Sequence, residues 1–332
     1  MSVWGRRAIT LPSLLLVTVI WLALLPLTLV AAVVGDLVRG GPWPIVRCVA
    51  FLTVYLACET IGVLAAGGVW LTSGPWTGTA RATFRRRNVA LQSWWANALY
   101  RAAERIYGLR TIVEGDEVVA PGPILLFIRH VSQADTLLPV VYATRRHGVA
   151  LRFVLKRELL WDPCLDVVGR RLPNAFVNRG SGESAREIAA VERLLDDLRE
   201  DEGVLIYPEG TRFTPAKRAR ALVRIAERSR ELAARAERLR RVLPPHLGGP
   251  LGLLRSNRRA DVVFCAHTGF EPAGSPREIV RGALVGSTIR VKFWRVPRGD
   301  VPDTDAERVA WLYAQWQRLD DWIAEVHPLS GG

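Results

Sequence analysis

The chain is poor in residues that mark several large classes of protein. Its 332 residues include four cysteines, one methionine and five histidines. The cysteines lie far apart and no C-x-x-C or H-E-x-x-H occurs, so neither a disulfide framework nor a zinc site is indicated. The P-loop and the G-x-G-x-x-G fingerprint are also absent, so nothing points to those two nucleotide-binding folds.

Lysine is nearly absent as well. Only Lys156, Lys217 and Lys292 are lysines among 45 Lys and Arg residues, and the formal net charge is +13. Arginine stays charged at physiological pH and grips phosphate through two parallel hydrogen bonds. Such a surface suits nucleic acid, anionic lipid or phosphorylated substrates. Arginine-rich codon usage alone would give the same composition, and both explanations stay open.

Charge is missing from most of the first 80 residues. Residues 8–35 carry none, and residues 48–74 carry one, Glu59. A helix needs about 20 apolar residues to cross a bilayer core, so both stretches are long enough. A cleaved signal peptide is the alternative for the first stretch, but its apolar core is too long and a second stretch follows. Residues 1–80 therefore predict a membrane hairpin of two helices.

Basic residues flank this hairpin more heavily than its linker. Arg6 and Arg7 precede it, and Arg81 and residues 85–87 follow it. The positive-inside rule then predicts that both ends, and the domain that follows, lie on the cytosolic face of a membrane. The second stretch either spans the bilayer or dips into one leaflet. Glu59 within it is functional, lies near a helix end, or packs against the first helix, and the last two explanations are the simpler ones.

Residues 81–332 alternate short apolar runs with amphipathic runs. Strands are expected at residues 124–128, 150–155, 175–177, 203–207, 261–266 and 289–294. Helices are expected at residues 184–199, with Ser184 and Glu187 as a capping box, and at residues 304–326. This alternation predicts an α/β domain with a mostly parallel sheet that helices cover on both faces.

Polar motifs follow three of the expected strands, where ligand sites of such sheets gather. The first motif contains His130 and, five residues later, Asp135. A neutral imidazole can take a proton from a hydroxyl, and does so better when a carboxylate orients it. Asp135 would begin a helix and point back at His130, with Ser132 as the helix cap. The other motifs are "NRG", with Arg179, and "YPEGTRF", residues 207–213.

Together, these motifs resemble the 1-acylglycerol-3-phosphate acyltransferase family, also called the PlsC-like lysophospholipid acyltransferases. That family has N-H-x4-D, F-x-x-R and F-P-E-G-T-R-S blocks in the same order. The resemblance covers roughly residues 89–289. It implies a glycerolipid acyltransferase-like α/β fold at a membrane, with acyl-CoA or acyl-carrier protein as donor and no metal or other cofactor.

The same resemblance assigns roles to residues of this sequence. It implies that His130 is the general base on a lysophospholipid hydroxyl and that Asp135 orients it. It also implies that Arg179 and the turn of Glu209, Gly210, Thr211 and Arg212 bind the glycerol phosphate. From its chemistry, Glu209 would hold Arg212 or a bound hydroxyl in place.

Several positions depart from the family pattern. Arg129 stands where the family usually has asparagine, and Tyr207 replaces a phenylalanine. The segment around Pro245 is similar to an L-P-R-x-x-G segment of microsomal members, with proline in place of its arginine. His267, in the candidate for the fourth block, is expected to be structural. The basic run at residues 215–241 is expected to form one long helix that lies on anionic lipid or faces solvent.

Three functions fit this sequence. The first is acyl transfer to lysophosphatidic acid, giving phosphatidic acid. The second is thioester hydrolysis or acyl transfer to another lysolipid or a glycolipid, which the same His–Asp pair would serve. The third is a non-catalytic lipid-binding scaffold, which the intact motifs disfavour. Nucleic acid is not an expected partner, because no reading motif is present.

Overall fold

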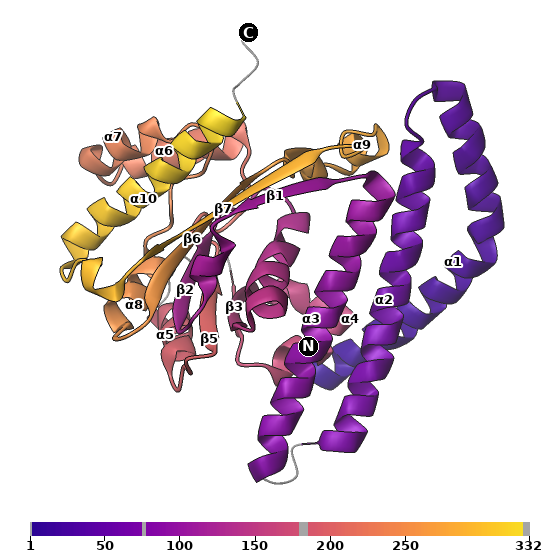
Figure 1. Cartoon of the computed structure of the whole chain (residues 1–332), viewed down its shortest axis with the longest axis horizontal. Coiled ribbons are helices and arrows are strands. Elements are labelled where there is room, and N and C mark those ends of the chain that lie inside the picture. Colours follow the sequence, from indigo (N-terminus) through magenta and orange to yellow (C-terminus); the bar gives the residue numbers. More distant parts are fainter. Residues whose placement is uncertain (1, 75–77, 179–184, 328–332) are drawn as a thin grey trace.

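The computed structural model describes residues 2–74, 78–178 and 185–327. In these ranges seven strands form one sheet, in the order β1-β7-β6-β2-β5-β3-β4 (Figure 1). The strands are β1 (Arg110–Glu114), β2 (Ile124–Ile128), β3 (Ala150–Lys156), β4 (Ala175–Val177), β5 (Glu202–Ile206), β6 (Asp261–Thr268) and β7 (Thr288–Val296). Neighbouring strands are parallel except β6 and β7. The predicted, mostly parallel sheet is confirmed.

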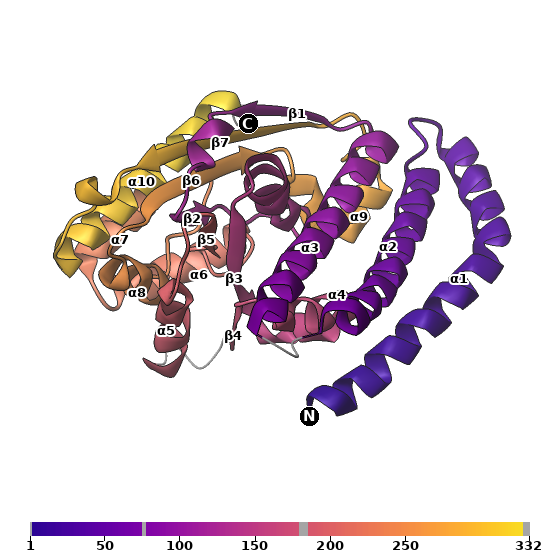
Figure 2. The same cartoon turned by 60° about the horizontal axis from the view of Figure 1, so that its bottom comes forward.

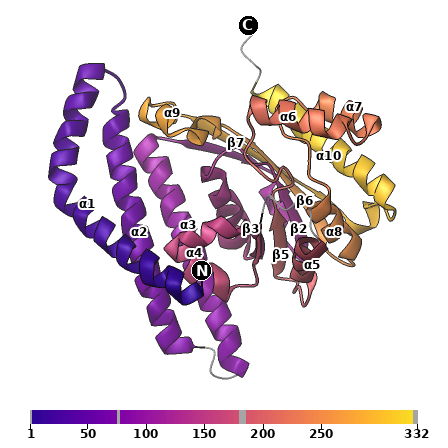
Figure 3. The same cartoon turned by 180° about the vertical axis from the view of Figure 1, so that it is seen from behind.

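Helices cover both faces of this sheet (Figures 2 and 3). The first three are long: α1 (Val3–Arg39), α2 (Pro44–Ser73) and α3 (Gly78–Tyr107). The others are α4 (Pro163–Val167), α5 (Ala185–Glu192), α6 (Pro215–Ala226), α7 (Arg230–Arg238), α8 (Gly248–Ser256), α9 (Pro276–Val280) and α10 (Asp305–Val326). Helix α3 lies on one face of the sheet, whereas α5, α8 and α10 lie on the other.

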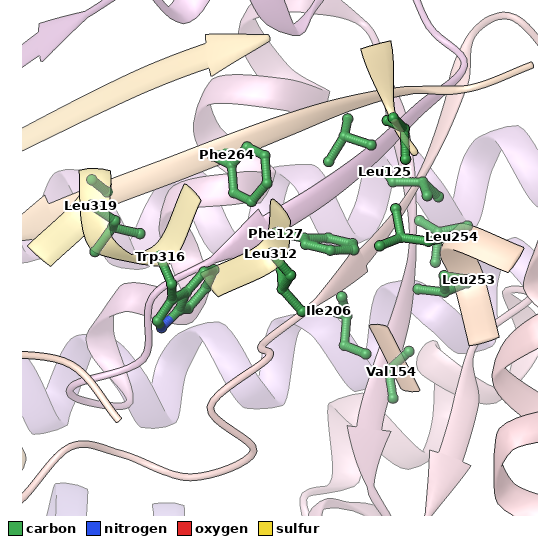
Figure 4. Packing of buried hydrophobic residues seen from close by; sticks show 14 of the residues in the cluster. Leu125, Phe127, Val154, Ile206, Leu253, Leu254, Phe264, Leu312, Trp316 and Leu319 are labelled. Carbon is green, nitrogen blue, oxygen red and sulfur yellow. The ribbon is translucent and has the colours of Figure 1, made fainter. Parts of the chain in front are cut away.

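Each face of the sheet has its own apolar core. Side chains alternate along a strand, so neighbouring residues of β2 serve opposite cores. Phe127 joins Phe264 and Trp316 in the core under α10, where Phe127 and Phe264 meet edge to face at 5.6 Å (Figure 4). Ile128 joins the core under α3. All five residues of β2 are buried, which fits a central strand covered on both faces.

Helices α1 and α2 are long and apolar enough to cross a membrane. Many large apolar side chains of α1 are exposed, and Pro12 and Pro26 lie inside it without dividing it. Glu59 of α2 is buried, and its carboxylate accepts a hydrogen bond from Trp95 Nε1 of α3 at 2.9 Å. Of the explanations for Glu59, packing within the protein matches this contact, although its partner is α3 and not α1.

Both ends of α1 contact the domain that follows. At the N-terminal end, Arg6 and Arg7 form ion pairs with the buried Asp166 of α4, at 2.5 and 2.9 Å. At the other end, a Cβ on Gly282 would lie 3.3 Å from Pro44, which follows the α1–α2 connection. The hairpin therefore lies along the domain, with its tip beside α9.

Two expected helices differ from the structure. The prediction that the basic run forms one helix is wrong. The run forms two helices, α6 and α7, because the Ser229 hydroxyl accepts a hydrogen bond from Leu232 N at 3.3 Å and starts a new helix. The helix expected at residues 184–199 is α5 followed by a 3₁₀ turn, Arg193–Leu195. Ser184 of the expected capping box lies outside the described residues, and Glu187 instead accepts from Asn178 N at 2.9 Å.

Candidate active site

The carboxyl end of β2 carries the predicted His–Asp pair. His130 Nδ1 lies 3.0 Å from Asp135 Oδ1. A carboxylate accepts here, so the imidazole proton resides on Nδ1 and Nε2 keeps its lone pair. Nε2 has no hydrogen-bond partner among the described residues, and the His130 side chain is 13% exposed. This nitrogen is available to take a proton from a hydroxyl.

Asp135 is held rigidly by the backbone that precedes it. Its Oδ2 accepts from Val131 N at 2.7 Å and Ser132 N at 2.8 Å, and the side chain is fully buried. Ser132 Oγ accepts from Ala134 N at 3.0 Å and Asp135 N at 3.3 Å, but the cap residue of the 3₁₀ turn that follows, Ala134–Leu137, is Gln133 and not the expected Ser132. These contacts fix the angle at which the carboxylate meets His130.

Glu209 is fully buried and holds the backbone of the site. Its Oε1 accepts from His130 N at 3.0 Å, and its Oε2 accepts from Leu243 N at 2.9 Å. Burial raises the pKa of Glu209 to about 8, although the Arg129 charge and the two N–H donors act against the shift. The expected contact with Arg212 is absent among the described residues. A buried carboxylate needs donors, and the nearest are backbone N–H groups.

The turn that follows Glu209 is tied to His130 a second time. Phe213 N donates to His130 O at 3.0 Å. Gly210 has a φ of +66°, and a Cβ at this position would lie 2.7 Å from His246 Cδ2. Only glycine meets both conditions. The family resemblance implies that Gly210 belongs to a phosphate-binding turn, and in the structure the group that approaches Gly210 closely is the His246 ring.

Cations surround this turn. Lys217 Nζ donates to Thr211 Oγ1 and to the carbonyl oxygen of Arg212, each at 3.0 Å. The half-buried Arg212 side chain makes no hydrogen bond or ion pair within the described part of the chain. Arg179, the second predicted cation, lies outside the described residues. The sequence analysis did not identify Lys217 as a site residue, although lysine is rare among the basic residues of this chain and each lysine therefore stands out.

Arg129, which the sequence shows only as a departure from the family pattern, holds together the backbone segments next to the His–Asp pair. Its side chain is 2% exposed and forms an ion pair with Glu271 at 2.7 Å. It also donates to His267 O at 2.6 Å and Arg241 O at 2.9 Å. Burial opposes ionisation of Glu271, but the Arg129 charge outweighs it and lowers the pKa of Glu271 to about 2. One guanidinium thus joins the ends of β2 and β6 to the segment before Leu243.

His267 occupies the interior of the same network. It is fully buried, and burial lowers its pKa, so the ring is neutral. Its Nε2–H donates to Arg129 O at 2.9 Å and lies 3.7 Å from Asp135 Oδ2. This position matches a structural role, in which His267 links β6 to the peptide that precedes His130.

An apolar cavity of about 420 Å³ opens beside the His–Asp pair, between the α2–α3 helices and the sheet. Tyr207, whose ring lies 4.7 Å from the His130 ring, forms part of its wall near the pair. Leu99 of α3 and Phe153 of β3 are among the apolar residues that line it, and Tyr55 and Asp162 add polar groups. A cavity of this size and composition suits a hydrocarbon chain.

The arrangement combines an oriented imidazole, two cations and an apolar cavity. It can remove a proton from a hydroxyl, hold a phosphate near that hydroxyl and shelter an apolar tail. In the described part of the chain, no three His, Cys, Asp or Glu side chains are grouped to hold a metal ion.

Comparison with known protein families identifies the domain that contains this site. The acyltransferase family model matches residues 110–248, which contain the His–Asp pair and the turn after β5. Residues 110–248 form an acyltransferase domain. The domain includes Arg129, Glu209 and Lys217, whereas His267 and Glu271, which complete the network described above, follow it in the sequence.

Two curated relatives and one solved structure are similar to this chain. The relatives are 1-acyl-sn-glycerol-3-phosphate acyltransferase delta of Homo sapiens and of Pongo abelii, each 26% identical over 182 residues. The match covers 53% of this chain and 45% of each relative, so the chain spans about half their length. The crystal structure of the lysophosphatidic acid acyltransferase PlsC from Thermotoga maritima has a TM-score of 0.56 at 14% identity. That match covers 85% of this chain and 98% of PlsC, and shows a shared fold.

Proposed function

We propose that this acyltransferase transfers an acyl group from acyl-CoA or acyl-carrier protein to the free hydroxyl of lysophosphatidic acid or a related lysophospholipid. His130 Nε2 takes the hydroxyl proton while the oxygen attacks the thioester carbonyl carbon. Asp135 stabilises the imidazolium that forms. The tetrahedral intermediate then breaks its carbon–sulfur bond, and the leaving thiolate takes the proton. The observation that carries this proposal is the 3.0 Å His130–Asp135 contact beside an apolar cavity.

The acceptor phosphate is assigned to the turn after β5. The Arg212 guanidinium has no partner in the described residues, and Lys217 Nζ lies at the same turn. Guanidinium and ammonium groups are common phosphate ligands, so the turn supplies the charge that lysophosphatidic acid requires. Arg179 is proposed as a further phosphate ligand on the basis of the family resemblance. Glu209 supports the turn from inside and does not itself reach the substrate.

A direct assay tests the proposed reaction. The protein in detergent, given lysophosphatidic acid and either acyl-CoA or acyl-carrier protein, should form phosphatidic acid. A panel of other lysolipids and a glycolipid acceptor identifies the preferred head group. Release of free fatty acid at the same rate without any acceptor would instead indicate a thioesterase, and lipid binding without turnover would indicate a scaffold.

We also propose that α1 and α2 anchor the protein in a membrane, with the catalytic domain on the cytosolic face. Arg6 and Arg7 pair with Asp166 of that domain, so the flanking cations and the domain lie on one side. The α1–α2 connection also lies beside α9. We therefore expect a cysteine introduced as Pro42→Cys to react with an impermeant maleimide from the cytosolic side.

The control for this labelling is Asp300→Cys, an exposed position of the domain. Both variants are made with Cys48→Ser, because the other three cysteines are buried. Labelling of Pro42→Cys only from the opposite side of the membrane would contradict the proposed arrangement and indicate a hairpin that crosses the bilayer.

A further inference from the structure

A second hollow lies on the face of the sheet that the apolar cavity does not use. It is a groove of about 590 Å³ between α7, α10 and β7. Trp294, Tyr313 and Trp322 form its aromatic wall, and four cations lie along it: Arg235, Arg238, Lys292 and Arg318. Ligand sites commonly have this size, and cations beside a partly apolar surface favour a phosphorylated ligand that also has an apolar part.

Two of these cations have no anionic partner in the described part of the chain. Lys292 lies 3.6 Å from Glu114, and Arg235 lies 3.1 Å from Glu231. Arg238 and Arg318 form no ion pair there, and the Arg318 guanidinium lies over the Trp294 ring at 4.9 Å. A guanidinium stacked on an aromatic ring still has its N–H edge free for a phosphate.

The groove also contains two exposed carboxylates, Asp321 and Glu325. These would repel a ligand that is all phosphate, but a carboxylate accepts well from a ribose hydroxyl or a base amino group. The combination therefore fits a nucleotide better than it fits inorganic phosphate. A large acidic protein surface fits less well, because the aromatic wall lies in a hollow.

The position of the groove connects it to the reaction. Lys292 pairs with Ala266 across the β6–β7 ladder, next to His267. His267 Nε2 lies 3.7 Å from Asp135 Oδ2, so one end of the groove lies beside the edge of the sheet that carries His130. The groove lies on the α10 face of the sheet and the apolar cavity on the α3 face, and Figures 1 and 3 show these two helices on opposite sides of the sheet.

We propose that this groove binds the adenosine phosphate part of coenzyme A, so that the acyl donor is a CoA thioester. The nucleotide lies on the α10 face, the pantetheine arm passes over the carboxyl edge of the sheet, and the thioester reaches His130. Arg238 and Arg318 bind the phosphates. This inference rests on the proposed acyl transfer and names its donor.

The test compares two donors that carry the same acyl group, acyl-CoA and acyl-pantetheine, the second of which has no nucleotide. In Arg238→Gln/Arg318→Gln, the KM for acyl-CoA should rise about tenfold or more, the equivalent of about 1.4 kcal/mol. The KM for acyl-pantetheine should not change, and kcat should stay close to that of the wild type with both donors. The matched control is Arg224→Gln/Arg228→Gln. It removes the same amount of charge from two exposed positions, one in α6 and one just after α6, and should leave both KM values unchanged.

Binding of adenosine 3′,5′-bisphosphate, measured by equilibrium dialysis, gives a readout that does not need turnover. The wild type and the control should bind it, and the groove variant should bind at least tenfold more weakly. An equal change of KM for both donors, or unchanged binding in the groove variant, would overturn the assignment. Activity with acyl-carrier protein but not with acyl-CoA would also overturn it and leave acyl transfer standing. Inactivity with every donor would instead refute the proposed function, and the dialysis would still decide the groove.

Discussion

Replacing His130 with alanine should lower kcat by about 10²–10⁴-fold, the usual contribution of a positioned general base. The KM for the acceptor should change little, because the phosphate and the tail are bound elsewhere in the site. His130 N and O both belong to the backbone, so their bonds to Glu209 and Phe213 survive the substitution. The variant should therefore fold, and the loss should appear as a loss of chemistry.

Asp135→Asn extends this prediction. The amide oxygen can still accept from Val131 N and Ser132 N, while the amide NH₂ then faces His130. An N–H donor there favours the imidazole tautomer that carries its proton on Nε2, which cannot act as a base. The expected loss of kcat is on the order of 10³–10⁴-fold, as for other histidine bases whose orienting carboxylate becomes an amide.

The chain offers a matched control for both substitutions. His147 Nε2 lies 2.7 Å from Asp116 Oδ2, a second His–Asp pair that precedes β3 and lies at the amino end of the sheet. His147→Ala should leave kcat within about twofold, because position and not pairing makes a histidine catalytic. A His130→Ala protein as active as His147→Ala would refute the proposed mechanism.

Local patterns predicted the sheet and the His–Asp pair well. The central strand β2 is a run of five buried apolar residues, and the polar residues after it can only lie at its carboxyl end. Strand β1 was not predicted, since its alternating "RTIVE" sequence is half exposed at the edge of the sheet and contains only two strongly apolar residues. The break between α6 and α7 was missed because a serine cap is a weaker signal than the continuous run of charges around it.

Side-chain partners were harder to predict than elements. Glu209 sits in a motif with Arg212, and the motif gives no sign that the carboxylate turns inward to bind the backbone of His130 and Leu243. The apolar cavity is lined by residues from Phe51 to Leu284, so no short stretch of sequence describes it. The domain boundary near residue 80 stays a prediction.

The second large effect is expected at Arg129. Arg129→Gln should lower the free energy of unfolding by about 3–5 kcal/mol, the cost of removing one partner from a buried ion pair. The guanidinium is 2% exposed, and its loss leaves the carbonyl oxygens of His267 and Arg241 without their donors. Arg255→Gln is the control: Arg255 and Asp305 are about half exposed, so breaking their pair should cost about 0–1 kcal/mol. Thermal and denaturant unfolding in detergent measure both.

The pH dependence of the free energy of unfolding distinguishes the two carboxyl groups, Glu271 and Glu209, whose ionisation the Arg129 charge favours. In the wild type Glu271, whose pKa is about 2, is ionised throughout pH 6–9, so Glu271 does not contribute to the pH dependence of wild-type stability there. Glu209, whose pKa is about 8, is mostly protonated at pH 6 and ionises as the pH rises. A raised carboxyl pKa means that the unfolded chain loses its proton first, so stability falls with rising pH until the folded pKa is passed. Without Arg129 the pKa of Glu209 rises further and this fall continues to higher pH.

The deficit of Arg129→Gln relative to the wild type should therefore be larger at pH 9 than at pH 6. Adding Glu271→Gln tests the other partner, because removing both members of a buried pair costs less than leaving one charge alone. The double variant should be more stable than the sum of the two single losses predicts. A deficit no larger than that of Arg255→Gln, and equal at both pH values, would show that Arg129 does not hold the site together. The family's usual asparagine would then serve equally well at this position.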